Sequence, residues 1–157
     1  MLTSSQILYA IRDFLDGLEF QYELLEERDA ILVRMPLEGK LKQVNAYFAC
    51  RDGSYTVNAY IELNAAAECR RRVAEYITRA NYGLRYGNFE MDFDDGEIRY
   101  RLTLDCRDRE YLSSELIGAT LAIPAQMFVR YSDGLIAVIY GIQTPEAAIQ
   151  EAEEDLE

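Results

Sequence analysis

The segment 88–105 constrains the fold of this chain more than any other, because apolar and charged residues alternate on both sides of Asp95-Gly96. Asp-Gly is a preferred pair for the tip of a two-residue β-hairpin. Counting outward from that tip matches apolar with apolar on one face and acid with base on the other: Phe93 with Ile98, Met91 with Tyr100, Phe89 with Leu102, Asp92 with Arg99 and Glu90 with Arg101. A shift by one residue would destroy both matches, so the pattern predicts an antiparallel hairpin with one buried face.

Four more strands are expected before this hairpin, at residues 20–26, 30–37, 43–50 and 55–63. In the last of them, apolar and polar residues alternate, as in a strand with one buried face. Asp52-Gly53 is a second tight-turn signal, and pairing outward from it sets Phe48 opposite Val57. These strands are therefore expected to form an antiparallel sheet.

Helices are expected at residues 4–17, 65–82 and 113–140. Thr3 and Gln6 have the spacing of a capping box at the start of the first helix, and Asn64 is of the residue type that caps the second. Pro124 is expected to divide the last segment into two helices, because proline removes a backbone hydrogen bond inside a helix. Together the elements predict an α+β domain with a curved antiparallel sheet and helices packed mainly on one face.

The charge of the chain restricts its possible partners. The sequence has 28 Asp and Glu against 16 Lys and Arg, a net charge of −12. Nucleic acids and anionic membrane surfaces are bound through Lys and Arg, so neither is an expected partner. Three cysteines without a close pair, and an N-terminus that reads as a helix rather than a leader, predict a cytoplasmic protein with reduced thiols.

The length of 157 residues, without a linker or repeat, predicts a single domain over residues 1–144. Residues 145–157 are expected to form an acidic tail that is helical or disordered, because they contain six acids and no base. Acidic runs usually keep a protein soluble. A docking segment is the alternative role of this tail.

No residue pattern predicts catalysis, a metal site or a cofactor, and the chain is expected not to be an enzyme. Histidine is absent, which excludes His-dependent triads, histidine metal ligands and proximal-His haem. Residues 92–97 resemble a calcium loop, but glycine falls at position five instead of six, and Thr103 stands where the bidentate Glu is needed. A charged hairpin turn is the better interpretation of this segment.

Arg70, Arg71 and Arg72 form a basic run on the second expected helix. Such runs are usually solvated, and three consecutive helical positions point in three directions. The alternative is that these arginines anchor an acidic segment of a partner, or the acidic tail of the chain itself. They are therefore candidates for partner binding.

Residues 135–139 are apolar at five consecutive positions, which is too uniform for an exposed helix face. The sheet can cover one side of this segment, and another helix or a second protomer must cover the rest. Leu135, Ile136 and Ile139 are therefore further candidates for partner binding. A homodimer is the expected assembly, because a symmetric interface buries such a patch in both copies.

The stretch 71–105, RRVAEYITRANYGLRYGNFEMDFDDGEIRYRLTLD, resembles the YbjN domain family. The residues that carry the likeness are Asn81-Tyr82-Gly83, Gly87-Asn88-Phe89-Glu90, Asp95-Gly96-Glu97-Ile98 with Tyr100-Arg101, and later Tyr131, Leu135 and Ala137-Val138-Ile139-Tyr140-Gly141. The family is described as bacterial sensory-transduction regulators, and its fold looks like that of type III secretion chaperones. Those chaperones are small, acidic, usually dimeric α+β proteins that bind other polypeptides.

The resemblance implies a non-enzymatic module, chaperone-like or regulatory, that binds a protein partner. The alternative is a small-molecule-binding regulatory domain with a pocket between the sheet and the helices. An enzyme of unrecognised type is the third hypothesis, which a deep polar cleft with convergent carboxylates would favour. A broad apolar groove would instead favour the protein-binding module.

Overall fold

The computed structural model describes residues 1–154, so residues 155–157 of the expected tail lie outside the described part. The described chain forms a six-stranded antiparallel sheet in the order β1-β2-β3-β4-β6-β5. Its elements are α1 (Ser4–Gly17), β1 (Tyr22–Leu25), η1 (Glu26–Arg28), β2 (Ala30–Pro36), β3 (Gln43–Arg51), β4 (Ser54–Tyr60), η2 (Ala67–Cys69), α2 (Arg70–Asn81), β5 (Asn88–Met91), β6 (Ile98–Asp105), α3 (Ser114–Ile139) and α4 (Pro145–Glu153).

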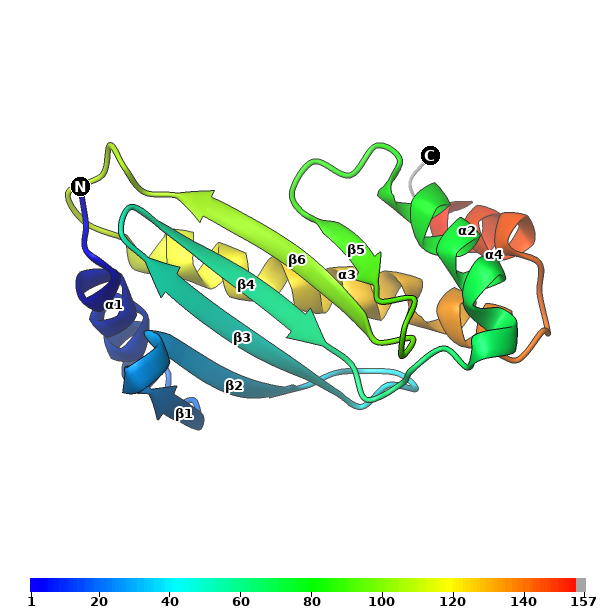
Figure 1. Ribbon diagram of the computed structural model, residues 1–157, viewed down its shortest axis with the longest axis horizontal. Helices are drawn as coiled ribbons and strands as arrows, with labels where there is room; N and C mark the ends of the chain where they lie inside the picture. Colours follow the sequence, from blue (N-terminus) through cyan, green and yellow to red (C-terminus); the bar gives the residue numbers. More distant parts are fainter. Residues whose placement is uncertain (155–157) are drawn as a thin grey trace.

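The helices leave one face of the sheet uncovered. Figure 1 shows α3 crossing behind the sheet, with α1 at one end of the molecule and α2 and α4 together at the other end. The strands follow this arrangement, since β3 and β4 alternate between buried residues toward α3 and half-exposed residues on the opposite face. The predicted fold class, an α+β domain with helices mainly on one face, is confirmed.

The predicted capping box of α1 and the predicted register of β3 with β4 are both present, because each is set by residues close together in the sequence. The Thr3 side chain accepts from the N–H of Gln6, and the Gln6 side chain accepts from the N–H of Thr3, which completes the capping box of α1. Phe48 lies opposite Val57 in the β3–β4 pair, as the Asp52-Gly53 turn predicts.

The core between sheet and helices is centred on Phe89 of β5. Its ring makes edge-to-face contacts with Tyr100 at 4.9 Å, Phe128 at 5.4 Å and Tyr131 at 5.6 Å between centroids. Contacts of this geometry add roughly 0.5–1.5 kcal/mol each to the burial of the rings. They join the β5–β6 hairpin to α3 and close the space between the two layers.

The β5–β6 hairpin has the predicted faces but a register that differs by two residues. Phe89 pairs with Tyr100 and Met91 with Ile98, so Glu90 lies opposite Arg99 rather than Arg101. The pairing of Phe93 with Ile98 and of Phe89 with Leu102 was wrong, and Phe93 is exposed in the turn.

The wider turn of this hairpin explains the difference in register. The N–H of Gly96 donates to Asp92 O at 2.8 Å, and the Asp92 carboxylate accepts from the N–H of Asp94 at 2.8 Å. These bonds make a four-residue loop of residues 93–96, instead of the two-residue loop that Asp95-Gly96 indicates. The two-residue change leaves the side chains within β5 and β6 on their predicted faces, because the strand period is two, whereas Phe93 now lies in the loop.

The predicted break at Pro124 is wrong, because α3 is one continuous helix with a buried proline inside it. Proline costs about 3 kcal/mol in a helix interior. Leu121 and Phe128, on either side of Pro124, are buried in the core. Burying one such side chain contributes roughly 1.5–3 kcal/mol, so the packing on both sides offsets the lost hydrogen bond.

The second helix begins later than predicted, since residues 67–69 form a 3₁₀ turn and α2 starts at Arg70. Asn64 does not cap it, and its amide instead donates to Asp95 O at 3.4 Å. Ala65 is held in place because its N–H donates to Gly96 O at 2.8 Å. The hairpin loop thus holds residue 65 away from the helix.

The acidic segment after Pro145 forms α4 up to Glu153. Thr144 caps this helix by accepting from the N–H of Ala147, and Pro145 occupies its first turn. Ala148 is buried, and the Tyr131 hydroxyl donates to the Glu153 carboxylate at 3.0 Å. Figure 1 places α4 beside α2, at the end of α3.

Candidate functional site

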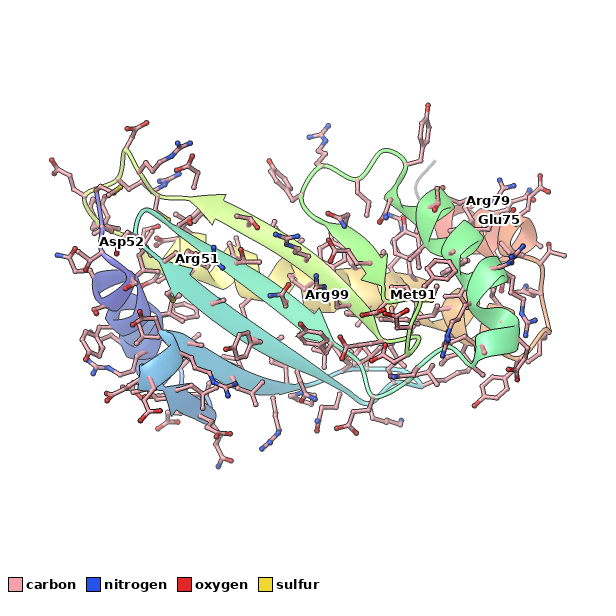
Figure 2. All side chains as sticks on the ribbon, viewed as in Figure 1. Arg51, Asp52, Glu75, Arg79, Met91 and Arg99 are labelled. Carbon is pink, nitrogen blue, oxygen red and sulfur yellow. The ribbon has the colours of Figure 1, made fainter. Side chains whose placement is uncertain are left out.

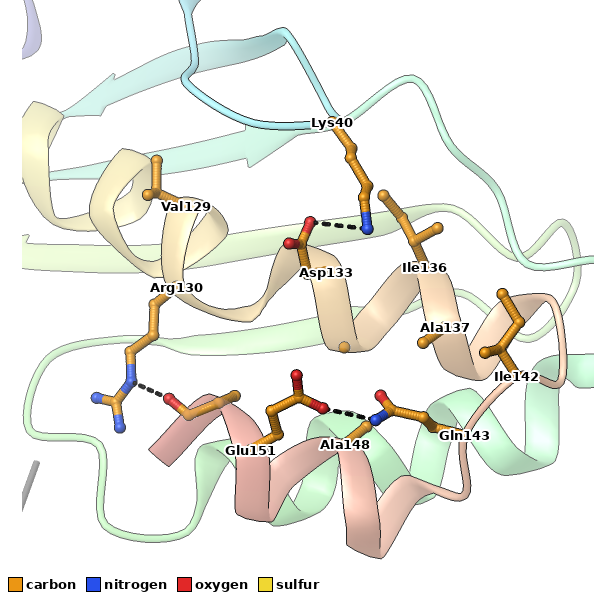
Figure 3. A pocket seen from close by; sticks show the side chains of 12 residues that line it. Lys40, Val129, Arg130, Asp133, Ile136, Ala137, Ile142, Gln143, Ala148 and Glu151 are labelled. Carbon is orange, nitrogen blue, oxygen red and sulfur yellow. Dashed lines mark hydrogen bonds and ion pairs between the residues drawn. The ribbon is translucent and has the colours of Figure 1, made fainter. Parts of the chain in front are cut away.

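A groove of about 720 Å³ runs between α3 and α4 and is closed on one side by the β2–β3 loop. We call it the α3–α4 groove. Figure 3 shows its lining side chains, which come from the loop (Lys40), from α3 and the turn after it (Val129, Arg130, Asp133, Gly134, Ile136, Ala137, Ile142, Gln143), and from α4 (Ala148, Glu151, Ala152).

Polar contacts brace the rim of the α3–α4 groove. Lys40 Nζ lies 3.5 Å from Asp133 Oδ1, which joins the loop to α3. Arg130 Nε donates to Ala152 O at 3.2 Å, and Gln143 Nε2 donates to Glu151 Oε2 at 2.6 Å. The dashed lines in Figure 3 mark these contacts, which tie both helices and the loop into one surface.

The α3 helix carries few charged residues, and some of its exposed side chains are apolar. Charged residues make up 28% of the whole chain, whereas the 26 residues of α3 include only Glu115, Arg130 and Asp133. Val129 is 47% exposed and Ile142, beyond the end of α3, is 74% exposed. Both line the groove. Exposed apolar surface rimmed by charge is typical of sites that bind another protein.

The apolar candidates from the sequence separate into two groups. Leu135 and Ile139 are buried by the chain itself. Ile136 is half-buried and lines the α3–α4 groove. Val129, Lys40 and Ile142 were missed, because the groove exists only after α4 has folded back against α3.

The three arginines of the basic run have three different environments. Arg70 Nη1 donates to Phe93 O at 2.9 Å, in the hairpin loop. Arg72 donates through Nε to Val138 O and through Nη2 to Ile139 O, both at 2.7 Å, and thereby caps the C-terminus of α3. Arg71 is exposed. The run therefore divides between structural contacts and one free surface position.

The uncovered face of the sheet carries a second surface hollow, of about 420 Å³, with three arginines around it: Arg51, Arg99 and Arg101. Figure 2 shows Arg51 and Arg99 over the face of the sheet that is turned toward the reader. Arg99 and Arg101 are two residues apart in β6, so strand parity alone places them on one face.

A carboxylate on the same face compensates part of this charge. Arg99 Nη2 lies 2.6 Å from Glu90 Oε2, and Arg101 Nη1 lies 3.5 Å from Glu90 Oε1. Partial burial alone would raise the pKa of Glu90, but the hydrogen bond and the charge of Arg99 outweigh it and hold the pKa below its ordinary value. Glu90 is therefore ionised at neutral pH.

The comparison with known families identifies the chain. The family model of YbjN, described as "Putative bacterial sensory transduction regulator", matches residues 8–137. This chain belongs to the YbjN family. Among curated protein sequences, no match was found.

Two solved structures have the fold of this YbjN-family chain. A crystal structure of YbjN from E. coli, titled as a "putative transcription regulator", has 12% identity and a TM-score of 0.56, over 86% of this chain and 90% of that one. A chain of the ExsC–ExsE complex has 14% identity and a TM-score of 0.53, over 83% of this chain and 96% of that one. At sequence identities this low, the similarity shows a shared fold alone.

The residues that resemble the YbjN family hold the fold together. The Asn81 side chain accepts from Phe89 N at 2.7 Å and donates to Phe89 O at 2.9 Å, which ties α2 to β5. Gly87 has a positive φ of 74°, and a side chain there would collide with the Tyr100 ring. Such residues identify an architecture rather than an activity.

Neither the cysteines nor the carboxylates form a reactive cluster in the described part of the chain. Cys50, Cys69 and Cys106 are buried, and desolvation raises the pKa of Cys50 to about 12, so its thiolate is not available at neutral pH. Among residues 1–154, no group of three or more Cys, Asp or Glu side chains could hold a metal ion. None of the helices in that range is both long and apolar enough to cross a membrane.

Calcium is expected not to bind to the loop of residues 92–97 with micromolar affinity. The Asp92 carboxylate is already used by the N–H of Asp94, and the Asp95 carboxylate by the N–H of Glu97, at 2.8 and 2.9 Å. Calcium sites of such affinity need six to eight oxygen ligands. Calorimetric titration with calcium, with magnesium as a control, should give only the heat of dilution. A saturable calcium signal would contradict this expectation.

Proposed function

We propose that this chain is a non-enzymatic, cytoplasmic protein-binding module of chaperone-like or regulatory type, and that it works as a homodimer. The α3–α4 groove is the observation that supports this most, because it exposes the apolar side chains of Val129 and Ile142 among charged groups, as protein-binding surfaces do. The two similar structures agree with such a role, since one is described as a "putative transcription regulator" and the other is a complex of ExsC with ExsE.

A second copy of the chain is the occupant that fits the groove. A symmetric dimer needs a surface that is complementary to itself. Arg130 and Asp133 have opposite charges and lie three residues apart on α3, beside the apolar Val129 and Ile136. Two antiparallel copies of α3 bring Arg130 of one protomer to Asp133 of the partner subunit, and vice versa.

Arg130 also has an unused donor. Its Nε is bonded to Ala152 O, but its buried Nη2 has no hydrogen-bond acceptor among the described residues. This atom is enclosed within the protomer, so the charge available to a second copy is that of the guanidinium group as a whole. The apolar residues supply the burial, and the charge pair sets the orientation.

A small-molecule pocket between the sheet and the helices has less support. The rings of Phe89, Phe128 and Tyr131 fill that interface with edge-to-face contacts. The 720 Å³ groove lies between two helices and a loop, outside the core.

Light scattering coupled to gel filtration at micromolar protein tests the dimer. The expected mass is about twice the 18.1 kDa of one chain. Val129→Glu, which places a charge in the groove of each protomer, is expected to raise the dimer dissociation constant at least about tenfold. Val129 is suitable because it is 47% exposed and its replacement leaves the core intact.

Tyr82→Glu is the matched control, since Tyr82 is 91% exposed and lies outside the groove. This variant should have the mass of the unaltered protein. A mass near 18 kDa for the unaltered chain, or a Val129→Glu protein that remains as dimeric as Tyr82→Glu, would contradict the proposed assembly.

A further inference from the structure

The uncovered face of the sheet is a second, chemically different surface. It lies on the side of the sheet opposite to α3, away from the α3–α4 groove (Figure 1). Its central hollow is lined by arginine, hydroxyl and amide groups, among them Arg51, Thr56, Asn58, Arg101 and Thr103. Thr56 and Thr103 hydrogen-bond to each other across β4 and β6 at 3.0 Å. This surface is polar and basic, so it suits another class of ligand than an apolar interface does.

The positive charges of Arg51 and Arg101 are not fully compensated by nearby carboxylates. The charge of Arg99 is compensated, because Arg99 pairs with Glu90 at 2.6 Å, and its guanidinium also donates to the Tyr60 hydroxyl at 3.1 Å. Arg101 is 48% exposed and reaches Glu90 only at 3.5 Å. Among residues 1–154, no ion pair within 4.0 Å involves Arg51.

A second carboxylate on this face, Asp105, does not compensate Arg51. Asp105 is bound by Arg107, whose Nη2 lies 2.5 Å from Asp105 Oδ2 and whose Nε is 3.0 Å from both of its oxygens. The hydrogen bonds of Arg107 hold the pKa of Asp105 at about 2, so this carboxylate stays ionised and paired. Arg51 and Arg101 therefore present positive charge to solvent on a chain whose net charge is −12.

We propose that the open face of the sheet binds an acidic polypeptide segment of the partner protein, with its carboxylates on Arg51 and Arg101. An acidic segment is repelled by the net negative charge of the chain and is attracted to a face on which arginines gather, which directs it to this site. This inference deepens the proposed function, on which it rests, because it names the chemistry of the partner.

A polypeptide suits the hollow better than a small anion does. Arg51 lies at one end of β3 and Arg101 lies within β6, two strands away, so one small anion is poorly placed to use both. The half-exposed Tyr47 and Tyr60 offer ring surface beside the arginines for the apolar parts of a peptide.

Fluorescence anisotropy with defined peptides tests the proposal. The probe is a labelled peptide of alternating Glu and Ser, about eight residues long, which extended spans the roughly 24 Å width of six strands. A peptide with Gln in place of every Glu is its neutral match. The Glu peptide should bind several times more tightly than the Gln peptide at about 50 mM salt. This difference should shrink at about 300 mM salt, because exposed charges are screened.

The double variant Arg51→Gln, Arg101→Gln is expected to weaken binding of the Glu peptide about three- to tenfold, from two exposed charge contacts. Glu90→Gln should strengthen binding, because it removes the carboxylate that competes for Arg101. Arg85→Gln is the control: it removes a positive charge from the exposed loop between α2 and β5, outside the hollow, and should leave the affinity for the Glu peptide unchanged. Circular dichroism checks that each variant is folded.

Equal affinity for the Glu and Gln peptides, or equal affinity of the double variant and Arg85→Gln, would overturn the proposal. Tighter binding of a single-stranded oligonucleotide of similar length would overturn it as well, in favour of a nucleic acid. Light scattering on the same samples measures the oligomeric state, so a failure of the peptide-binding proposal can be told apart from a failure of the dimer proposal. A dimer that does not bind the Glu peptide leaves the α3–α4 groove proposal intact and rejects only this one.

Discussion

Replacing Gly96 with alanine is expected to lower the free energy of unfolding by about 3–5 kcal/mol, among the largest effects of a single substitution. Gly96 has a φ of 77°, where alanine is strained by about 1–2 kcal/mol. A Cβ at this position would also overlap the carbonyl group of Ala65, which is backbone and cannot rotate away. The Ala65 N–H donates to Gly96 O, so the substitution would separate two segments that hold each other in place.

Gly39→Ala is the matched control for the backbone strain. Gly39 also has a positive φ, of 95°, but a Cβ there would meet no atom within 4 Å. Its replacement should cost only about 1–2 kcal/mol. Urea denaturation of both variants measures the difference. Equal losses for Gly96→Ala and Gly39→Ala would show that the contact with Ala65 contributes nothing.

Replacing Arg72 with methionine is expected to lower the free energy of unfolding by about 2–4 kcal/mol. Hydrogen bonds from a charged donor contribute roughly 1.5–3 kcal/mol each, and Arg72 makes two, both 2.7 Å long, to the last carbonyls of α3. Both bonds are only partly buried, so the expected loss is less than their full sum. Arginine at a helix C-terminus also interacts favourably with the helix dipole. Methionine keeps most of the side-chain volume, so the change tests the guanidinium rather than the packing.

Arg71→Met is the control for Arg72→Met, because Arg71 is the next residue in the same helix and is exposed. Its replacement should change the free energy of unfolding by less than about 0.5 kcal/mol. Thermal and urea unfolding of the two variants give the comparison. Similar stabilities for both variants would mean that Arg72 is a surface charge and not a structural cap of α3.

The basic run shows why the sequence could identify candidate partner-binding residues but could not assign a role to each of them. Arg70, Arg71 and Arg72 are alike in type and adjacent in the chain, and helical geometry separates their directions. The partner that each one meets comes from elsewhere: the hairpin loop for Arg70, the end of α3 for Arg72 and solvent for Arg71. Only contacts over long sequence distances distinguish them.

The apolar segment 135–139 shows the same limit. Its composition indicated that all sides of the helix need cover, and the structure supplies part of that cover from within the chain. Leu135 and Ile139 are buried there, whereas Ile136 lines the groove. The groove itself combines α3 with Lys40, far back in the sequence, and with α4, so no local pattern could reveal it.

The sequence by itself determined the features that depend on side-chain period and on short-range capping. Alternation assigned the faces of β3, β4, β5 and β6, and the Thr3–Gln6 box marked the start of α1, because both effects act within a few residues. Composition also excluded histidine chemistry altogether.

The tertiary structure alone decided the features in which a local preference competes with burial or with a distant partner. Pro124 remains inside α3 because the packing of Leu121 and Phe128 offsets its lost hydrogen bond. The hairpin takes its wider turn because Asp92 binds the backbone of its own loop while Gly96 packs on Ala65. The two surfaces proposed for binding also depend on this level, since each collects residues that only the folded chain brings together.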